Sequence, residues 1–200
     1  MSSTRAYAER GAARGGSWRE RLIEVAAELT RVGGWSTITM AKLADRVGVS
    51  RQTVYNEIGS KPQLAEAMVM HELTAFLERV DAEFAAHPDD LVEAIRAAAA
   101  SVLAMARTNP LLHAVLSASH GAESDLLPLL TTQVEPVIDA ARLIIAGHLG
   151  HYELDVPEER VGSLVDMVIR LVLSHVTAPG SATPEQTADE IAWIAARVLA

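Results

Sequence analysis

"RVGVSRQTVYNEIGSK" (residues 46–61) decides the fold of the N-terminal part of the chain. Gly48 supplies the backbone freedom that a tight turn requires, and Ser50 has the hydroxyl preferred at a helix N-terminus. The apolar spacing predicts one short helix over about 40–47 and a second over about 51–57. Two short helices joined by Gly-Val-Ser predict a helix-turn-helix unit.

The second short helix carries polar side chains on the face that its apolar residues leave free. The inward faces of the unit are expected from Leu43, Ala44, Val47, Val49, Val54 and Ile58. A recognition helix places its N-terminal residues in the major groove, where Arg pairs with guanine and Gln or Asn with adenine. Tyr55 and Lys61 suit phosphate contacts, and Thr39 and Ser50 stand at helix starts, where backbone N–H groups bind anions. The predicted DNA-binding residues are Thr39, Ser50, Arg51, Gln52, Thr53, Tyr55, Asn56 and Lys61.

The longer segment "TITMAKLADRVGVSRQTVYNEIGSKPQLAEAM" resembles the DNA-binding domain of the TetR (tetracycline-repressor) family of bacterial transcription regulators. The matching features are Thr39, Leu43-Ala44, Gly48-Val49-Ser50, Thr53-Val54-Tyr55 and Ser60-Lys61 before a long helix. The resemblance covers about residues 17–68. It implies a homodimer that binds a palindromic operator and is released when a small ligand enters the larger C-terminal domain.

The chain departs from the family pattern just before the end of the recognition helix. The family commonly has Phe or His near the positions of Asn56 and Glu57, and often an aromatic at Ile58. Asn56 is therefore interpreted as a base-reading residue. Glu57 is expected to pair with a neighbouring basic side chain or to face solvent.

The charge is distributed unevenly. Residues 1–61 hold ten Lys/Arg and six Asp/Glu, a net +4, whereas the remaining residues carry −13. A basic N-terminal unit on an acidic body indicates a polyanionic partner at one end only, with ordinary charge scatter as the alternative. Residues 1–16 form an expected flexible basic arm, which either enters a minor groove or is a solvated tail.

Composition narrows the class of protein. Half of the 200 residues are hydrophobic, only eight are aromatic and none is Cys. The lack of Cys excludes disulfides, thiolate metal sites and cysteine catalysis. No uncharged apolar run is long enough for a membrane span, and the N-terminus lacks the apolar core of a signal peptide, so we expect a cytoplasmic protein.

Helix-capping patterns predict an all-α fold of about nine helices. "SWRE", "SKPQ" and "TPEQ" have the spacing of capping boxes at residues 17, 60 and 183. The expected domains are the arm over 1–16, the DNA-binding domain over 17–60 and a ligand-binding and dimerisation domain over 61–200. Besides the two short helices, the expected helices are about 17–33, 61–86, 89–108, 110–119, 124–149, 157–177 and 184–199.

The resemblance implies dimerisation through the last two helices, for which apolar side chains and small residues are the candidates. The expected interface residues are Gly162, Ser163, Val165, Ile169, Ile191, Trp193, Ile194 and Val198. A core within one chain would explain the same apolar pattern without a partner.

The resemblance also implies a ligand between the C-terminal helices, and the apolar, Met-containing sequence suits an acyl chain or a hydrophobic drug. The candidate pocket residues are Leu103, Met105, Ala106, Leu112, Leu116, Val134, Ile138, Met167, Arg170, Leu171 and His175. Most of these are equally explained as core. Asp166 and Arg170 lie four residues apart, which suits a ligand-binding polar pair or an ion pair across the dimer.

The preferred interpretation is therefore a ligand-responsive transcriptional regulator, most often a repressor, and not an enzyme. The pairs His148/His151 and His113/His120 lack an obvious third metal ligand, so no metal or other cofactor is expected. One alternative is a helical module that sequesters a ligand without binding DNA. A weaker one is a small hydrolase using His120 or Asp125.

Overall fold

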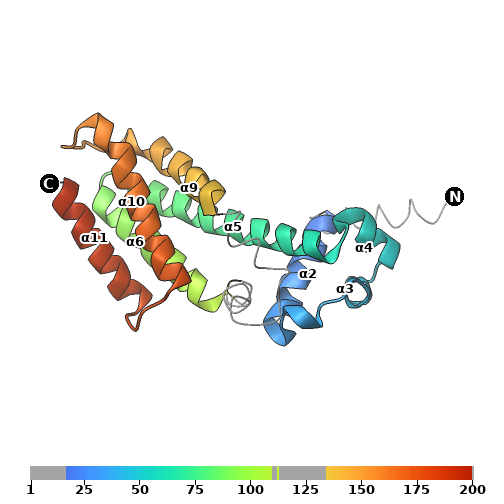
Figure 1. Cartoon of the computed structure of the whole chain (residues 1–200). Helices are drawn as coiled ribbons and strands as arrows, with labels where there is room; N and C mark the ends of the chain where they lie inside the picture. Colours follow the sequence, from blue (N-terminus) through green and yellow to red (C-terminus); the bar gives the residue numbers. More distant parts are fainter. Residues whose placement is uncertain (1–16, 110–111, 113–133, 200) are drawn as a thin grey trace. The chain divides into compact units, whose positions relative to one another are not determined.

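Helices account for every regular element that the structure describes (Figure 1). The computed structural model describes residues 17–109, 112 and 134–199. Within these ranges the all-α prediction is confirmed. The chain divides into two compact units inside one long helix, between His71 and Glu72. The sequence placed this boundary earlier, where the same helix begins.

The first unit contains the predicted helix-turn-helix. Its helices begin and end within a residue or so of their expected bounds because the capping interactions are local. Ser17 and Glu20 form the predicted capping box, with Ser17 N donating to Glu20 Oε2 at 2.7 Å. The elements are α2 (Trp18–Gly33), a 3-10 turn (Trp35–Thr37), α3 (Met40–Val47), α4 (Arg51–Ile58) and the start of α5 (Lys61–Ala86).

Each of these elements contributes buried apolar side chains. The predicted inward residues Leu43, Ala44, Val54 and Ile58 are buried, whereas Val47 and Val49 are only partly so. The other large side chains buried here are Leu22, Ile23, Trp35, Ile38, Met40, Leu64 and Met68. Burial of this apolar area holds α4 in a fixed orientation on the other helices.

Two glycines with positive φ make the turns at either end of α4. Gly48 is left-handed, with φ +78°, and its amide donates to Ala44 O at 2.9 Å. Gly59 has φ +92° and ψ −110°, a conformation that only glycine adopts readily. Ser60 and Gln63 then form the second predicted capping box, in which Ser60 N donates to Gln63 Oε1 at 2.8 Å.

The second unit is a bundle in which α6 lies along α11 and α9 lies along α10 (Figure 1). Asp90 caps α6, and Thr183 with Gln186 forms the third predicted capping box before α11. The helices of this unit, besides the second part of α5, are α6 (Leu91–Thr108), α9 (Val134–Leu149), α10 (Glu158–Thr177) and α11 (Pro184–Leu199).

Two of the apolar clusters in this bundle contain residues that were expected at a dimer interface. Ile191 of α11 is buried with Ala99 of α6 and Ala188. Ile169 of α10 is buried with Ile138 and Ala141 of α9, and Val165 packs on the same cluster. Ile169 and Ile191 were expected at a dimer interface but are buried within one chain, whereas Val165 of the same expected set is only partly buried. An apolar helix face can pack within one chain or against a partner chain. For Ile169 and Ile191 the packing is within one chain.

Two expected segments lie outside the described residues. These are the short helix to about 119 and the beginning of the helix over 124–149. Among the described helices, none combines the length and apolar character needed to cross a membrane.

Candidate nucleic-acid interface

The outward face of α4 presents polar side chains at successive turns. Val54 and Ile58 are buried on the inner side, which leaves Arg51, Gln52 and Asn56 exposed. Tyr55 is 52 % exposed, a large value for an aromatic residue. The helix therefore offers hydrogen-bonding groups and an aromatic hydroxyl to a partner, as the sequence predicted.

The start of α4 is fixed by hydrogen bonds among its own residues. Ser50 Oγ accepts from the Thr53 amide at 3.0 Å, and the two hydroxyl oxygens are 2.8 Å apart. Thr39 Oγ1 caps α3 in the same way, accepting from the Lys42 amide at 3.1 Å. Thr39 and Ser50 thus act as the predicted helix caps and hold the neighbouring backbone N–H groups in place.

Gln52 and Asn56 form a hydrogen-bonded pair one turn apart on the exposed face. Gln52 Nε2 donates to Asn56 Oδ1 at 2.8 Å. The two amides predicted to read bases are therefore hydrogen-bonded to each other.

Lys61 lies against Trp35 at the start of α5. Its ammonium donates to the Trp35 carbonyl at 3.3 Å and stands 4.8 Å from the centre of the indole ring. Trp35 is only 2 % exposed, and its Nε1 has no hydrogen-bond partner among the described residues. The sequence did not predict a role for Trp35. The only indication was its position, as a large aromatic residue between the Gly-Gly helix end and the capping Thr39.

Two further contacts tie α2 to the helix-turn-helix. Arg19 donates to the backbone carbonyl of Glu57 at 2.7 Å, near the end of α4. Arg46 stands 4.0 Å from Glu28, and both side chains are about half exposed. Glu57 does meet a basic side chain, but through its carbonyl rather than the expected carboxylate. The Arg19 contact adds a polar tie to the apolar packing that fixes α4.

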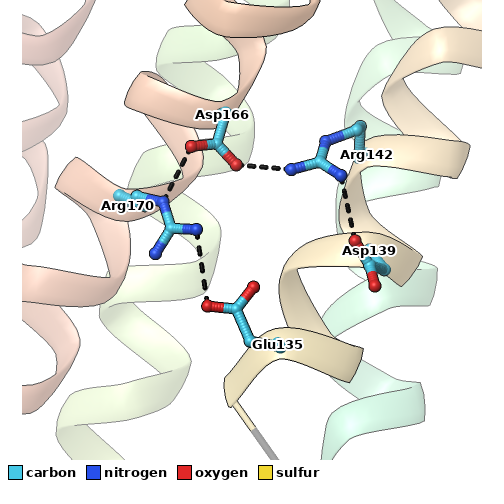
Figure 2. A network of polar contacts seen from close by, with 5 residues as sticks. All are labelled: Glu135, Asp139, Arg142, Asp166 and Arg170. Atoms are coloured by element: carbon cyan, nitrogen blue, oxygen red, sulfur yellow. Dashed lines mark hydrogen bonds and ion pairs between the residues drawn. The ribbon is translucent and has the colours of Figure 1, made fainter.

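A charged network joins α9 and α10 in the second unit (Figure 2). Asp166 accepts from Arg142 at 2.5 Å and from Arg170 at 2.7 Å. Arg142 also pairs with Asp139, and Arg170 approaches Glu135. The hydrogen bond from Arg170, and after it the one from Arg142, holds the pKa of Asp166 below its ordinary value. The pair with Arg170 is thus made within one chain, not across a dimer.

The network borders an open groove of about 620 Å³, formed by α10 and Arg142 of α9. The lining residues are Arg142, Glu159, Gly162, Ser163, Asp166, Met167 and Arg170. This groove is open, and its lining is about equally polar and apolar, so it is not the enclosed apolar cavity that a hydrophobic ligand requires.

Two family models match the chain. The model described as "Bacterial regulatory proteins, tetR family" matches residues 22–68, and "Bacterial Tetracyclin repressor, C-terminal domain" matches residues 90–197. The chain belongs to the tetR family. It is a DNA-binding transcriptional regulator and not an enzyme.

Two bacterial proteins are similar to this chain in sequence. The HTH-type transcriptional regulator AlkX of Mycobacterium tuberculosis is 29 % identical over 171 residues, 86 % of this chain and 80 % of the relative. The nucleoid occlusion factor SlmA of Vibrio cholerae is 34 % identical over 100 residues, half of each chain.

Solved structures of tetR-family proteins share the fold. The TetR family repressor AlkX from Dietzia sp. has a TM-score of 0.71 at 24 % identity, covering 92 % of this chain and 97 % of that one. A regulator from Pectobacterium atrosepticum has a TM-score of 0.60 at 18 % identity, covering 90 % and 91 %.

The residues predicted for the ligand pocket of this tetR-family chain are not all in one place. Leu103, Ala106 and Ile138 are buried, and Met167 and Arg170 line the open groove. Leu116 and the side chain of Val134 lie outside the described residues. The partly buried members of the set are Met105, Leu112, Leu171 and His175.

The predicted interface residues that remain exposed lie on α10 and α11. Trp193, Ile194 and Val198 of α11 are 58 %, 45 % and 47 % exposed. Ile194 and Val198 are four residues apart and share one helix face, and Trp193 lies beside that face. Gly162 and Ser163 are exposed on α10. Val165 is partly exposed, so six of the eight expected residues keep surface that a partner can contact.

Proposed function

We propose that this tetR-family regulator is a repressor that binds a palindromic operator as a homodimer and is released by a small hydrophobic effector. The observation that carries the proposal is the polar, exposed face of α4, held rigidly by the buried Val54 and Ile58. A helix so presented fits the major groove, and Arg51 and Gln52 near its N-terminus are placed to reach base edges.

The exposed apolar face of α11 supports the dimer. Ile194 and Val198 are exposed on one face of the helix, and the exposed Trp193 lies beside it. The Arg197 guanidinium stands 5.4 Å from the Trp193 ring, which presents the indole as a supported anchor. Clustered exposed apolar groups of this kind mark interaction sites. In the dimer, the two copies of α4 would address half-sites about 34 Å apart.

The continuity of α5 supports a route for release. This helix runs without a break from Lys61 to Ala86 and so belongs to both units. An effector that binds the second unit and displaces α5 would change the spacing of the two recognition helices. Operator affinity and effector affinity are then linked, and each lowers the other by the same factor.

The DNA-binding proposal is tested by selecting duplexes from a random pool and then titrating the selected sequence. Wild-type protein is expected to select a palindrome and to bind it with a steep salt dependence. Arg51→Ala is expected to relax preference at one position of each half-site by about 1–3 kcal/mol. Arg31→Ala, the same charge change at the exposed end of α2, should leave base preference unchanged. Selection of no sequence by wild-type protein would refute the proposal and leave the sequestering module in its place.

The effector is tested by thermal unfolding in the presence of candidate ligands. The Dietzia repressor is implicated in the biodegradation of n-alkanes, so n-alkanes and fatty acyl compounds come first, followed by cationic hydrophobic drugs. An effector at 100 times its Kd should stabilise the chain by about 2.7 kcal/mol. The same compound should weaken operator binding, and stabilisation without release would contradict the linkage.

A further inference from the structure

The pairing of Gln52 with Asn56 determines what this part of α4 can recognise. Gln52 Nε2 carries two hydrogens and Oε1 accepts, so the side chain can make contacts in two directions. One Nε2 hydrogen is given to Asn56 Oδ1 at 2.8 Å. The other Nε2 hydrogen and Oε1 remain for a partner. Both residues are exposed, so that partner can reach them.

The remaining donor and acceptor of Gln52 match one base in the major groove. Adenine presents N7 as an acceptor beside the N6 amino donor, whereas guanine presents two acceptors, N7 and O6. A glutamine amide that offers one donor and one acceptor satisfies both groups of adenine but only one of guanine. The hydrogen bond to Asn56 also fixes which end of the amide is the donor.

We propose that Gln52 reads an adenine in each operator half-site and that Asn56 is a positioning residue that orients Gln52 rather than reading a base itself. The proposal rests on the proposed function, because it needs α4 to lie in the major groove. It offers a different role for Asn56 from the base reading that the sequence predicted. Holding Gln52 in one orientation before binding reduces the conformational entropy lost when the contact forms.

The test compares the base preferences of three variants with those of wild-type protein, selected from the same random duplex pool. Wild-type protein should show an adenine position in each half-site. Gln52→Ala should lower the preference there by about 5- to 150-fold, the loss of a bidentate contact. Asn56→Ala should lower it at the same position by about 2- to 10-fold, the loss of one orienting hydrogen bond. Asn56→Asp keeps an acceptor for Nε2, so it should retain the adenine preference while weakening binding to all sequences.

A second measurement removes the acceptor from the base. Replacing that adenine with 7-deazaadenine deletes N7, so wild-type affinity should fall while the affinity of Gln52→Ala stays the same. Arg51→Ala serves as the matched control on the same helix, since it should relax a different position and leave adenine selected.

Several results would overturn the inference without touching the proposed function. In the first, wild-type protein selects a palindrome, but Gln52→Ala changes the preference at no adenine position. In the second, Asn56→Ala lowers the base preference at a different position from Gln52→Ala. The inference would also be wrong if Asn56→Asp lost as much of the adenine preference as Asn56→Ala does. A wild-type protein that selects no DNA at all would instead remove the proposed function, and this inference with it.

Discussion

Lys61 is held by its neighbour before any DNA is present. Its ammonium donates to the Trp35 carbonyl and lies over the indole ring. The residue predicted from sequence as a phosphate contact is thus also a structural contact between the 3-10 turn and α5. Because Lys61 is only partly buried, the same ammonium can still approach a phosphate oxygen.

Lys61→Met keeps the aliphatic stem and removes the charge, so it separates these two contributions. We expect a loss of about 1 kcal/mol in the free energy of unfolding, from the cation–π contact and the hydrogen bond. We also expect weaker binding to all DNA sequences alike, with the salt-dependence slope reduced by about 1. Urea unfolding and filter-binding titrations at several salt concentrations measure the two effects. Lys42→Met, at an exposed position, should leave stability unchanged, and an unaltered salt slope in Lys61→Met would make Lys61 purely structural.

Asp166 makes stability depend on acid pH. Its pKa is lowered in the folded chain by Arg170 and Arg142, so its carboxylate stabilises the fold above the ordinary pKa. That stabilisation is lost as pH falls through the lowered folded pKa, in the range below about pH 4. Asp166→Asn should therefore unfold at lower denaturant concentration than wild-type protein at pH 7. The difference should shrink as the pH falls below 4.

Asp139→Asn is the matched control for this pH dependence. Asp139 contacts only Arg142 of the network in Figure 2, and its side chain is 64 % exposed. The control should therefore change stability less at pH 7. A gap between Asp166→Asn and wild-type protein that stays constant from pH 7 to pH 3 would contradict the assignment.

Among the elements, the helix starts were predictable because each is encoded within four residues. The capping pairs Ser17/Glu20, Ser60/Gln63 and Thr183/Gln186 all form as expected. A cap needs no information from the rest of the chain, and the same holds for Gly48 at the turn.

Packing between elements was less predictable, because periodicity shows which face of a helix is apolar and not what covers it. Ile169 and Ile191 satisfied the pattern of an interface and are core residues. Trp35 has no periodic neighbours, since it lies in a single 3-10 turn, and its burial depends on α5. The contact between Gln52 and Asn56 depends on side-chain conformation, which the sequence does not specify.

The two glycine turns around α4 are expected to differ in their tolerance of a methyl group. A Cβ at Gly48 meets nothing within 4 Å, so Gly48→Ala should cost only the left-handed conformation, about 1 kcal/mol. A Cβ at Gly59 would overlap Gln63 Oε1. The φ and ψ angles of Gly59 are also less favourable for a residue with a side chain than those of Gly48. Gly59→Ala should therefore cost roughly 2–3 kcal/mol in urea unfolding.

A double-mutant cycle isolates the overlap at Gly59. In Gly59→Ala/Gln63→Ala the obstructing side chain is absent, so the double variant should lose less than the sum of the two single losses. Strict additivity would mean that backbone strain alone accounts for the cost.

At the scale of the whole molecule, the α11 face predicts a dimer that is required for operator binding. Sedimentation of wild-type protein at micromolar concentration should give a dimer. Ile194→Asp and Val198→Asp place a charge on the exposed apolar face and should give monomers. Because linked half-sites gain 10²–10⁴ in avidity, the monomeric variants should lose about that factor for the palindrome.

Val32→Asp is the control for these charged variants. Val32 is 81 % exposed on α2, so the substitution adds the same charge without burying it in the proposed interface. This variant should remain dimeric. A monomeric wild-type protein, or dimeric Ile194→Asp and Val198→Asp proteins, would count against the α11 interface.

The two ends of the 26-residue helix α5 belong to different units, so hydrogen exchange at each end measures the stability of a different unit. Leu64, Ala65 and Met68 are buried near its start and Phe84 near its end, whereas no side chain between Val69 and Glu83 is fully buried. Amide hydrogen exchange in the first turns should therefore follow opening of the first unit, and exchange in the last turns opening of the second. Amides in the middle can also exchange through local opening that unfolds neither unit. A single peptide-resolved exchange profile of α5 would thus measure separately how DNA protects one unit and how an effector protects the other.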